Sequence, residues 1–186
     1  GLLRFHHLVC QDEALEYVIA IGWRVLGKPD SWSRRMLAFK KGEPGAVRGA
    51  CEILPPAVSR LTLSRKPTIV ASAIPSQECQ LPEQHPLWLL GASLAMSIGC
   101  SWAPRLLSKE PHTSIHSIRD ATERRETVAG KYSSRYVAGS PLIMVVDDFA
   151  TQGTTLSDCA RSIRVENPRA KVVGIVLGKH IRPNHA

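Results

Sequence analysis

Two apolar segments flank a helical segment late in the sequence, and this arrangement constrains the fold more than any other feature. Residues 142–146 (LIMVV) and 171–177 (KVVGIVL) are nearly continuous runs of aliphatic side chains. Between them, residues 154–166 carry apolar side chains at helical spacing, from Leu156 to Ile163. Strands without polar alternation are typical of parallel sheets that are buried on both faces. The pattern predicts an α/β fold, with a Rossmann-like parallel sheet flanked by helices.

The rest of the chain divides near residue 66. Apolar residues at helical spacing predict three helices before that point, over residues 12–26, 31–39 and 46–54. Pro55 and Pro56 are expected to end the third helix, because proline lacks the backbone donor that a helix interior needs. We therefore expect residues 1–66 to form a helical N-terminal segment that packs on a core formed by residues 67–186. In that core, residues 67–75 predict a strand that leads into a loop, and residues 85–99 predict a packed helix.

Composition narrows the class of protein. No apolar run approaches the about 20 residues of a membrane-spanning helix, so no membrane insertion is expected. A cytoplasmic location is expected because the scattered cysteines are typical of reduced thiols. The five cysteines are scattered without a C-x-x-C pair, which argues against a disulfide framework and a structural zinc site. The net charge of +8 favours anionic partners but does not choose between nucleic acid and phosphorylated small molecules. Solubility alone would explain the same charge.

The most informative motif follows the strand at 142–146. Asp147 and Asp148 stand at the expected carboxyl end of that strand, where parallel sheets bind ligands. The next residues pass through Gly153 into a helix N-terminus, whose backbone N–H groups and dipole suit a phosphate. The residues expected to hold that phosphate are Ala150, Thr151, Gln152, Gly153, Thr154 and Thr155. An ordinary strand-to-helix connection with an aspartate cap would explain one aspartate, but not this whole set.

The two carboxylates suggest what accompanies the phosphate. They can accept hydrogen bonds from a vicinal diol, or hold Mg²⁺ through water. A sugar that carries a phosphate and turns its hydroxyls toward Asp147 and Asp148 fits both halves of the motif. A P-loop is not indicated because no Gly-Lys-Ser/Thr follows, and the dinucleotide pattern G-x-G-x-x-G is absent.

Residues 143–156, IMVVDDFATQGTTL, resemble the phosphoribosyl-pyrophosphate (PRPP) loop of the type I phosphoribosyltransferases. The shared pattern is four aliphatics, two acids, two variable residues, then Thr-x-Gly-x-Thr. Residues 34–54 and 106–132 look like segments of the ComF-type, competence-associated branch of that family. The second of these resembles its flexible hood, placed here at 106–135, with Arg124 and Gly130 in their usual places. The resemblance implies the type I phosphoribosyltransferase fold, Mg²⁺ as cofactor and PRPP and pyrophosphate as ligands.

The resemblance also assigns roles. It implies that Asp147 and Asp148 hold the ribose hydroxyls, that the 150–155 turn holds the 5-phosphate, and that Arg124 is a third catalytic residue. Ser72, Ala73, Ser76 and Gln77 are the candidates for the pyrophosphate loop. Lys109 and Arg119 are candidates that would close over pyrophosphate from the hood, although both also suit solvated surface charges.

Departures from the branch bear on turnover more than on PRPP binding. The chain has no zinc ribbon of paired cysteines, and its pyrophosphate loop lacks the arginine that the branch carries. Two functions therefore stay open. The first is an enzyme that transfers the phosphoribosyl group of Mg-PRPP to an unidentified nitrogen acceptor and releases pyrophosphate. The second is a non-catalytic, PRPP-sensing protein related to DNA uptake that binds single-stranded nucleic acid. A homodimer is one open assembly, since dimers are common in the resembling family.

Overall fold

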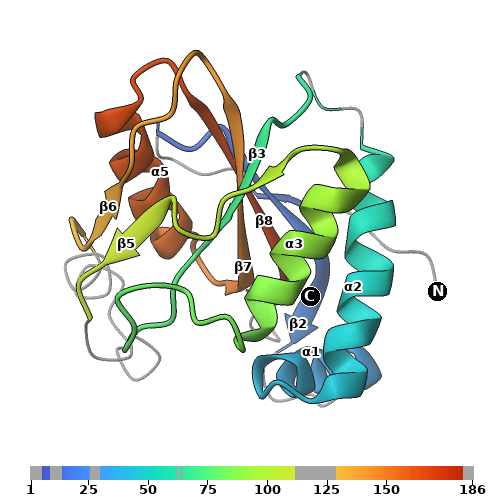
Figure 1. The fold of residues 1–186 in the computed structure, drawn as a ribbon. Coiled ribbons are helices and arrows are strands. Elements are labelled where there is room, and N and C mark those ends of the chain that lie inside the picture. Colours follow the sequence, from blue (N-terminus) through green and yellow to red (C-terminus); the bar gives the residue numbers. More distant parts are fainter. Residues whose placement is uncertain are drawn as a thin grey trace.

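The computed structural model describes residues 6–8, 14–25, 30–61, 63, 65–111 and 129–181. Its elements, in chain order, are β1 (His6–Leu8), β2 (Tyr17–Val25), α1 (Ser31–Lys40), α2 (Pro44–Ser59), β3 (Ile69–Ser72), α3 (Pro86–Ile98), β4 (Ser101–Trp102), β5 (Leu107–Lys109), β6 (Tyr132–Ser134), β7 (Leu142–Ala150), α5 (Thr154–Glu166) and β8 (Lys171–Ile181). Figure 1 shows a central sheet with α1, α2 and α3 on one side and α5 on the other.

The central sheet has the strand order β1-β2-β8-β7-β3-β4. β1 pairs with β2 in antiparallel orientation, and all other neighbours in this sheet are parallel. β5 and β6 form a separate antiparallel pair, which lies near α5 in Figure 1. The predicted α/β class, with a mostly parallel sheet flanked by helices, is confirmed by this topology.

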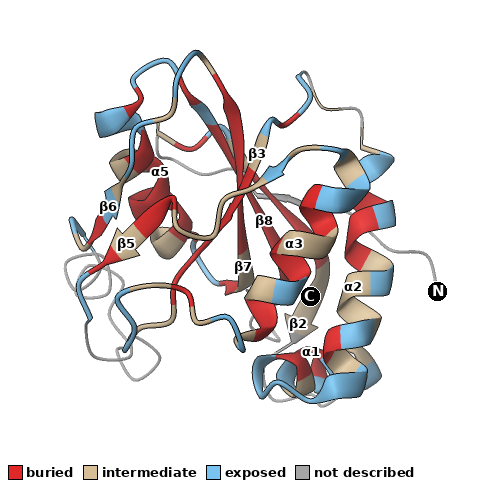
Figure 2. Ribbon diagram, viewed as in Figure 1, coloured by how far each residue is buried: buried red, intermediate tan, exposed pale blue. Residues whose placement is uncertain are grey.

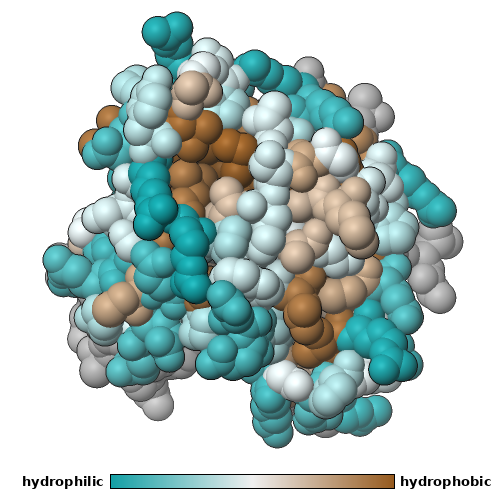
Figure 3. Space-filling model, in the orientation of Figure 1, coloured by the Kyte–Doolittle hydropathy of each residue, from teal (hydrophilic) through white to brown (hydrophobic). Residues whose placement is uncertain are grey.

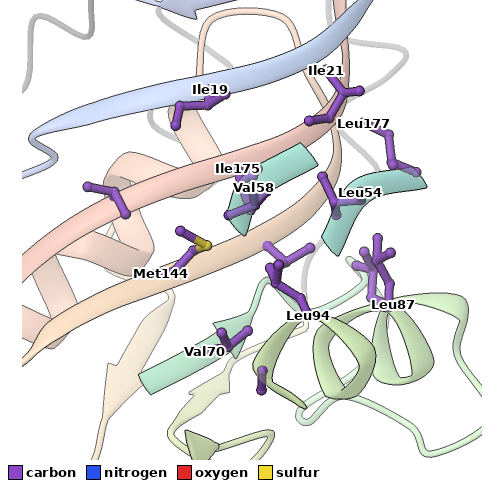
Figure 4. Close-up of a cluster of buried hydrophobic side chains, with 14 of the residues drawn as sticks. Ile19, Ile21, Leu54, Val58, Val70, Leu87, Leu94, Met144, Ile175 and Leu177 are labelled. Atoms are coloured by element: carbon purple, nitrogen blue, oxygen red, sulfur yellow. The ribbon is translucent and has the colours of Figure 1, made fainter. Parts of the chain in front are cut away.

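Two hydrophobic clusters, one on each face of the sheet, form the core. Alternate residues of β7 point to opposite faces. Ile143 and Val145 join the cluster beneath α5, whereas Met144 and Val146 join the cluster beneath α1, α2 and α3. Figure 4 shows part of the second cluster, where Leu94 of α3 lies close to strand residues such as Val70. In Figure 2 the central strands are almost entirely buried, as the apolar runs predicted.

The N-terminal part of the chain differs from the prediction. Residues 17–25 form strand β2 and not the helix expected over 12–26. β2 pairs along its length with β8, from Tyr17 opposite Val173 to Val25 opposite Ile181. Burial on both faces is the reason: Val18 joins the α5 cluster and Ile19 joins the opposite cluster. The segment before residue 67 therefore supplies strands of the sheet as well as helices, and the expectation of a helical segment was wrong.

The Pro55-Pro56 pair does not end its helix, because α2 continues to Ser59. A proline at 55 leaves the carbonyl of Cys51 without its usual intrahelical donor. The Ser93 hydroxyl of the adjacent α3 lies 3.5 Å from that carbonyl and donates to it. Tertiary packing between α2 and α3 thus compensates for the missing backbone bond.

The predicted helices at 31–39, 85–99 and 154–166 are confirmed within a residue or two as α1, α3 and α5. None of the helices in the described ranges is long and apolar enough to cross a membrane. Figure 3 shows a mainly hydrophilic face, with apolar colour confined to limited areas.

Candidate functional site

The candidate site lies where the direction of the sheet connections reverses. From β3 the chain crosses through α3 to β4 on one side, whereas from β7 it crosses through α5 to β8 on the other. β3 and β7 are parallel neighbours, so their carboxyl ends flank the point of reversal. Such a point is where open α/β sheets bind ligands. In Figure 1 these strand ends face the lower part of the molecule, beneath which α1 lies.

The two strands part directly at the site. Ser72 lies opposite Val146, and the backbone N–H of Ala73 donates to the Val146 carbonyl at 2.9 Å. Beyond this point β7 continues to Ala150 with only β8 beside it. The sequence predicted a strand that ends at Val146, but Asp147 and Asp148 also belong to β7. Because the chain turns away after β3, the edge of β7 that faces β3 is not paired with β3 beyond Val146.

Asp147 points toward the α5 face. Burial, followed by repulsion from Asp148, raises the pKa of the Asp147 carboxyl well above its usual range. Its electrostatic neighbours on this face include Lys109, Tyr132 and Cys159. The Asp148 backbone N–H donates to Asp147 Oδ1 at 2.8 Å. Burial and the Asp148 charge both disfavour the ionised carboxylate, and a bound cation or hydrogen-bond donor would offset that cost.

Asp148 points toward the opposite face, where α1 lies. Its Oδ2 is 3.3 Å from the Lys40 ammonium, and its side chain is 17% exposed. The Phe149 backbone N–H donates to Asp148 Oδ1 at 2.6 Å. His85, the N-cap residue of α3, is also close enough to interact with Asp148, but burial lowers the His85 pKa. The two aspartates therefore meet different partners on the two faces of one strand.

The turn after β7 forms a helix N-terminus suited to an anion. Gly153 is the N-cap residue of α5, has a left-handed φ of 81°, and provides no side-chain cap. A left-handed backbone conformation favours glycine, because in other residues the Cβ atom would lie too close to the following carbonyl oxygen. Thr151 and Gln152 are exposed and precede it, while Thr154 and Thr155 open the helix half-buried. The predicted residues thus run from the end of β7 at Ala150, which is buried, through the connection at 151–153 to the first turn of α5 at Thr154 and Thr155.

The predicted pyrophosphate loop is partly structural. Ser72 is buried, and its hydroxyl donates to the Ala73 carbonyl at 2.9 Å and to the Val146 carbonyl at 3.3 Å. Ala73 is also buried. Ser76 is half-buried and Gln77 is exposed. Of the four candidates, Ser76 and Gln77 are the two whose side chains reach the surface.

Lys109 is buried and lies beneath this loop. It is 5% exposed, so the interpretation as a solvated surface charge was wrong for this residue. Its ammonium donates to the Ile74 carbonyl at 3.0 Å and to the Pro75 carbonyl. Burial lowers the pKa of the Lys109 ammonium from 10.5 to about 8. Lys109 therefore ties β5 to the loop that follows β3.

Tyr132 strengthens the same junction from β6. Its hydroxyl accepts a hydrogen bond from the Ile74 backbone N–H at 3.0 Å and donates to the Ile74 carbonyl at 3.1 Å. Burial raises the pKa of Tyr132 well above its usual value. The loop after β3 is thus held by two buried side chains from the β5–β6 pair. The other two hood candidates, Arg119 and Arg124, lie outside the described residues.

Sequence patterns did not single out the residues of α5 that fix this region. The buried Asp158 carboxylate accepts from the backbone N–H groups of Gly130 at 2.9 Å and Tyr132 at 3.3 Å. The buried Asn167, which follows α5, donates to the Arg135 carbonyl at 3.1 Å and accepts from the Val137 N–H. The helical pattern of α5 does not predict these contacts, because the partners of Asp158 and Asn167 lie some 30 residues away along the chain.

The donor set at the end of β7 is compatible with a hard divalent cation. Mg²⁺ prefers carboxylate and phosphate oxygens, and it keeps several water ligands. Asp147 and Asp148 offer carboxylate oxygens, and burial together with the nearby Asp148 charge raises the pKa of Asp147. Within the described ranges, no three His, Cys, Asp or Glu side chains form a metal-ligand group.

Comparisons with known proteins give distant structural likenesses. No family model matches the sequence, and no curated protein matches it. Adenine phosphoribosyltransferase from Leishmania tarentolae is 13% identical, with a TM-score of 0.47 over 87% of this chain and 91% of that one. A hypoxanthine phosphoribosyltransferase from Staphylococcus aureus is 12% identical, with a TM-score of 0.38 over 74% and 73% of the two chains. Identities and TM-scores this low place no residue and assign no activity, so function has to be argued from the site itself.

Proposed function

We propose that this chain binds Mg-PRPP at the carboxyl end of β7 and transfers its phosphoribosyl group to a nitrogen acceptor, as a ComF-like type I phosphoribosyltransferase. One observation carries the proposal. Two carboxylates near the end of β7 are followed within a few residues by a helix N-terminus without a side-chain cap, at the reversal point of the sheet. A diol beside a phosphate is the ligand chemistry that this combination matches.

Each part of PRPP has a place in this proposal. The 5-phosphate accepts hydrogen bonds from backbone N–H groups and threonine hydroxyls of the 151–155 turn. The ribose hydroxyls donate to Asp147 and Asp148. The pyrophosphate lies toward Ser76 and Gln77, in the loop that Lys109 and Tyr132 hold in place. Arg119 and Arg124 remain predicted contacts to pyrophosphate.

The chemistry that follows is a substitution at C1 of the ribose. The bond from C1 to the pyrophosphate oxygen breaks, and its electron pair leaves with pyrophosphate. The lone pair of the acceptor nitrogen forms the new bond to C1, and any proton on that nitrogen passes to water. Mg²⁺, when bound, would offset the negative charge of the leaving group. The chain's own contribution is to orient the ribose and to bind the 5-phosphate and the pyrophosphate at separate positions.

The test uses two glycines with the same backbone strain. Gly153 and Gly139 have φ values of 81° and 86°, so alanine is strained at both positions. Gly153→Ala also places a methyl group in the proposed phosphate turn, whereas nothing lies within 4 Å of a Cβ built on Gly139. Loss of one or more charge-assisted hydrogen bonds, each worth about 1.5–3 kcal/mol, predicts PRPP binding weaker by about ten- to a hundredfold in Gly153→Ala.

Isothermal titration of Mg-PRPP into the two variants and the wild type measures this effect. Gly139→Ala should bind PRPP within about twofold of the wild type, as its site is untouched. Equal affinities for all three proteins would contradict the proposed phosphate turn. Release of pyrophosphate on addition of a panel of nitrogen bases would then test turnover separately from binding.

The nucleic-acid hypothesis remains a prediction that no described feature favours over this one. It rests on the net charge of +8 and on the resemblance of the hood, and residues 112–128 of the hood lie outside the described residues. The homodimer and the cytoplasmic location also remain predictions.

A further inference from the structure

A cluster of basic side chains surrounds Phe149, the residue that follows the two aspartates. Arg24 Cζ lies 5.4 Å and Lys40 Nζ 5.7 Å from the centroid of the Phe149 ring. The His180 ring centroid is 4.9 Å from the same centroid, with an interplanar angle of 39°. These residues come from β2, α1 and β8, and the proposed function uses none of them. We call Arg24, Lys40, Phe149 and His180 the basic cluster.

A hydrogen bond between Arg24 and His180 determines which nitrogen of the His180 ring carries the proton. Arg24 Nη1 lies 2.8 Å from His180 Nε2. A guanidinium remains charged and has no acceptor, so it donates and Nε2 accepts. His180 is therefore a neutral imidazole in this contact, and its proton is on Nδ1. The pair thus combines a planar cation with a planar ring that has an N–H group of its own.

Phe149 keeps two of the cations together. Phe149 is 9% exposed, so the residue is largely covered by its neighbours. A cation near the face of an aromatic ring is stabilised by about 0.5–2 kcal/mol, which offsets the repulsion between Arg24 and Lys40. A buried aromatic ring at position 149 accordingly acts as a platform for positive charge beside Asp148.

Lys40 and Arg24 differ in their partners. Asp148 is the carboxylate that pairs with Lys40. Arg24 contacts an uncharged ring. The Arg24 guanidinium therefore has no carboxylate partner among the described residues. An anionic group would pair with that charge, and a flat one would match the planar guanidinium and imidazole.

We infer that the basic cluster is the acceptor subsite and that it selects a planar heteroaromatic acid, with a carboxylate directed at Arg24. This inference rests on the proposed function for the role of the acceptor, because Asp148 contacts both the cluster and the proposed ribose position. The preference for a planar acid is a property of binding to the basic cluster and does not require transfer. The carboxylate is not consumed when the ring nitrogen bonds to C1 of the ribose.

The test compares two probes that differ in charge but hardly in shape. Nicotinate carries a carboxylate where nicotinamide carries an amide. Binding of each to the full chain is measured by saturation-transfer NMR titration, with and without Mg-PRPP. The inference predicts that the wild type prefers nicotinate by at least tenfold. Equal binding of the two probes, or binding of neither, would overturn it.

Variants then locate the preference. Arg24→Gln removes the charge and should reduce the preference to less than threefold, while Arg24→Lys restores part of it. Arg35→Gln, on the exposed side of α1, is the matched control and should keep the full preference. Lys40→Gln provides a second variant at a position whose side chain is 38% exposed, should Arg24→Gln fold poorly. A full preference in both Arg24→Gln and Lys40→Gln would refute the assignment.

Failure of this inference is separable from failure of the proposed function. Tight Mg-PRPP binding without a preference for nicotinate would leave the PRPP site intact and overturn the acceptor class. A preference for nicotinate that depends on Arg24, in a chain that does not bind PRPP, would support the anion subsite and remove its role in transfer.

Discussion

Lys109 allows a sharp test, because the structure gives both its burial and its partners. Its ammonium is 5% exposed, and burial lowers its pKa from 10.5 to about 8. Between these two values the unfolded chain binds a proton that the folded chain has released, so the free energy of unfolding rises with pH in that window. The burial of charged Lys109 therefore destabilises the fold fully below about pH 8, and this cost disappears as the pH approaches 10.5.

The shift corresponds to about 3 kcal/mol of destabilisation at pH 7, and about 2 kcal/mol of this is relieved by pH 9.5. Lys109→Met removes the titrating group. The free energy of unfolding of the wild type, relative to that of Lys109→Met, should thus increase by about 2 kcal/mol from pH 7 to pH 9.5. The difference between the two proteins matters here, because other groups that titrate in this range are common to both.

Urea denaturation at half-unit pH intervals measures this difference. Lys131→Met is the control, because Lys131 pairs with Glu110 at 3.1 Å near the surface of the same pair of strands. A difference between wild type and Lys109→Met that stays constant from pH 7 to pH 9.5 would refute the argument from burial. Lys109→Met should also weaken PRPP binding, since the Ile74 and Pro75 carbonyls lose their cationic donor.

Two further predictions concern packing and buried hydrogen bonds. Gly91→Ala should destabilise the fold by about 1–3 kcal/mol in thermal unfolding, because its Cβ would lie 2.3 Å from the Trp102 ring. Gly49→Ala, also helical but with nothing within 4 Å, should stabilise the fold by about 0.5–1 kcal/mol, and equal effects of the two would contradict this packing. Asp158→Ala should cost about 2–4 kcal/mol in urea denaturation, since two buried backbone N–H groups lose their acceptor. A cost below 1 kcal/mol would show that water replaces the carboxylate.

The sequence predicted the second half of the fold better than the first. Strands β7 and β8 have apolar side chains on both faces, and no amphipathic helix matches such a run. Residues 17–25 are ambiguous in isolation, because a short apolar run can be a strand or a buried helix. Pairing with β8 decides the matter, and no local pattern contains that information.

The candidate site shows the same division between local and distant information. The helix N-terminus after Gly153 was predicted, because the glycine and the start of the helix are adjacent in sequence. The interaction of Lys109 with the loop after β3 was not, because it joins residues 34 and 35 positions apart. Lys40 and Asp148, which form an ion pair across the sheet edge, are further apart still. Such contacts follow from the topology of the sheet and not from spacing.

The aspartates at the end of β7 are the centre of this account, and one titration tests them most directly. Mg-PRPP is titrated calorimetrically into the wild type and into the variant Asp147→Asn/Asp148→Asn, with the fold of each confirmed by circular dichroism. The account predicts micromolar binding to the wild type and no measurable binding to the variant, because the ribose hydroxyls and the cation lose both carboxylates. Equal affinity in the two proteins, or no binding to the wild type, would contradict it.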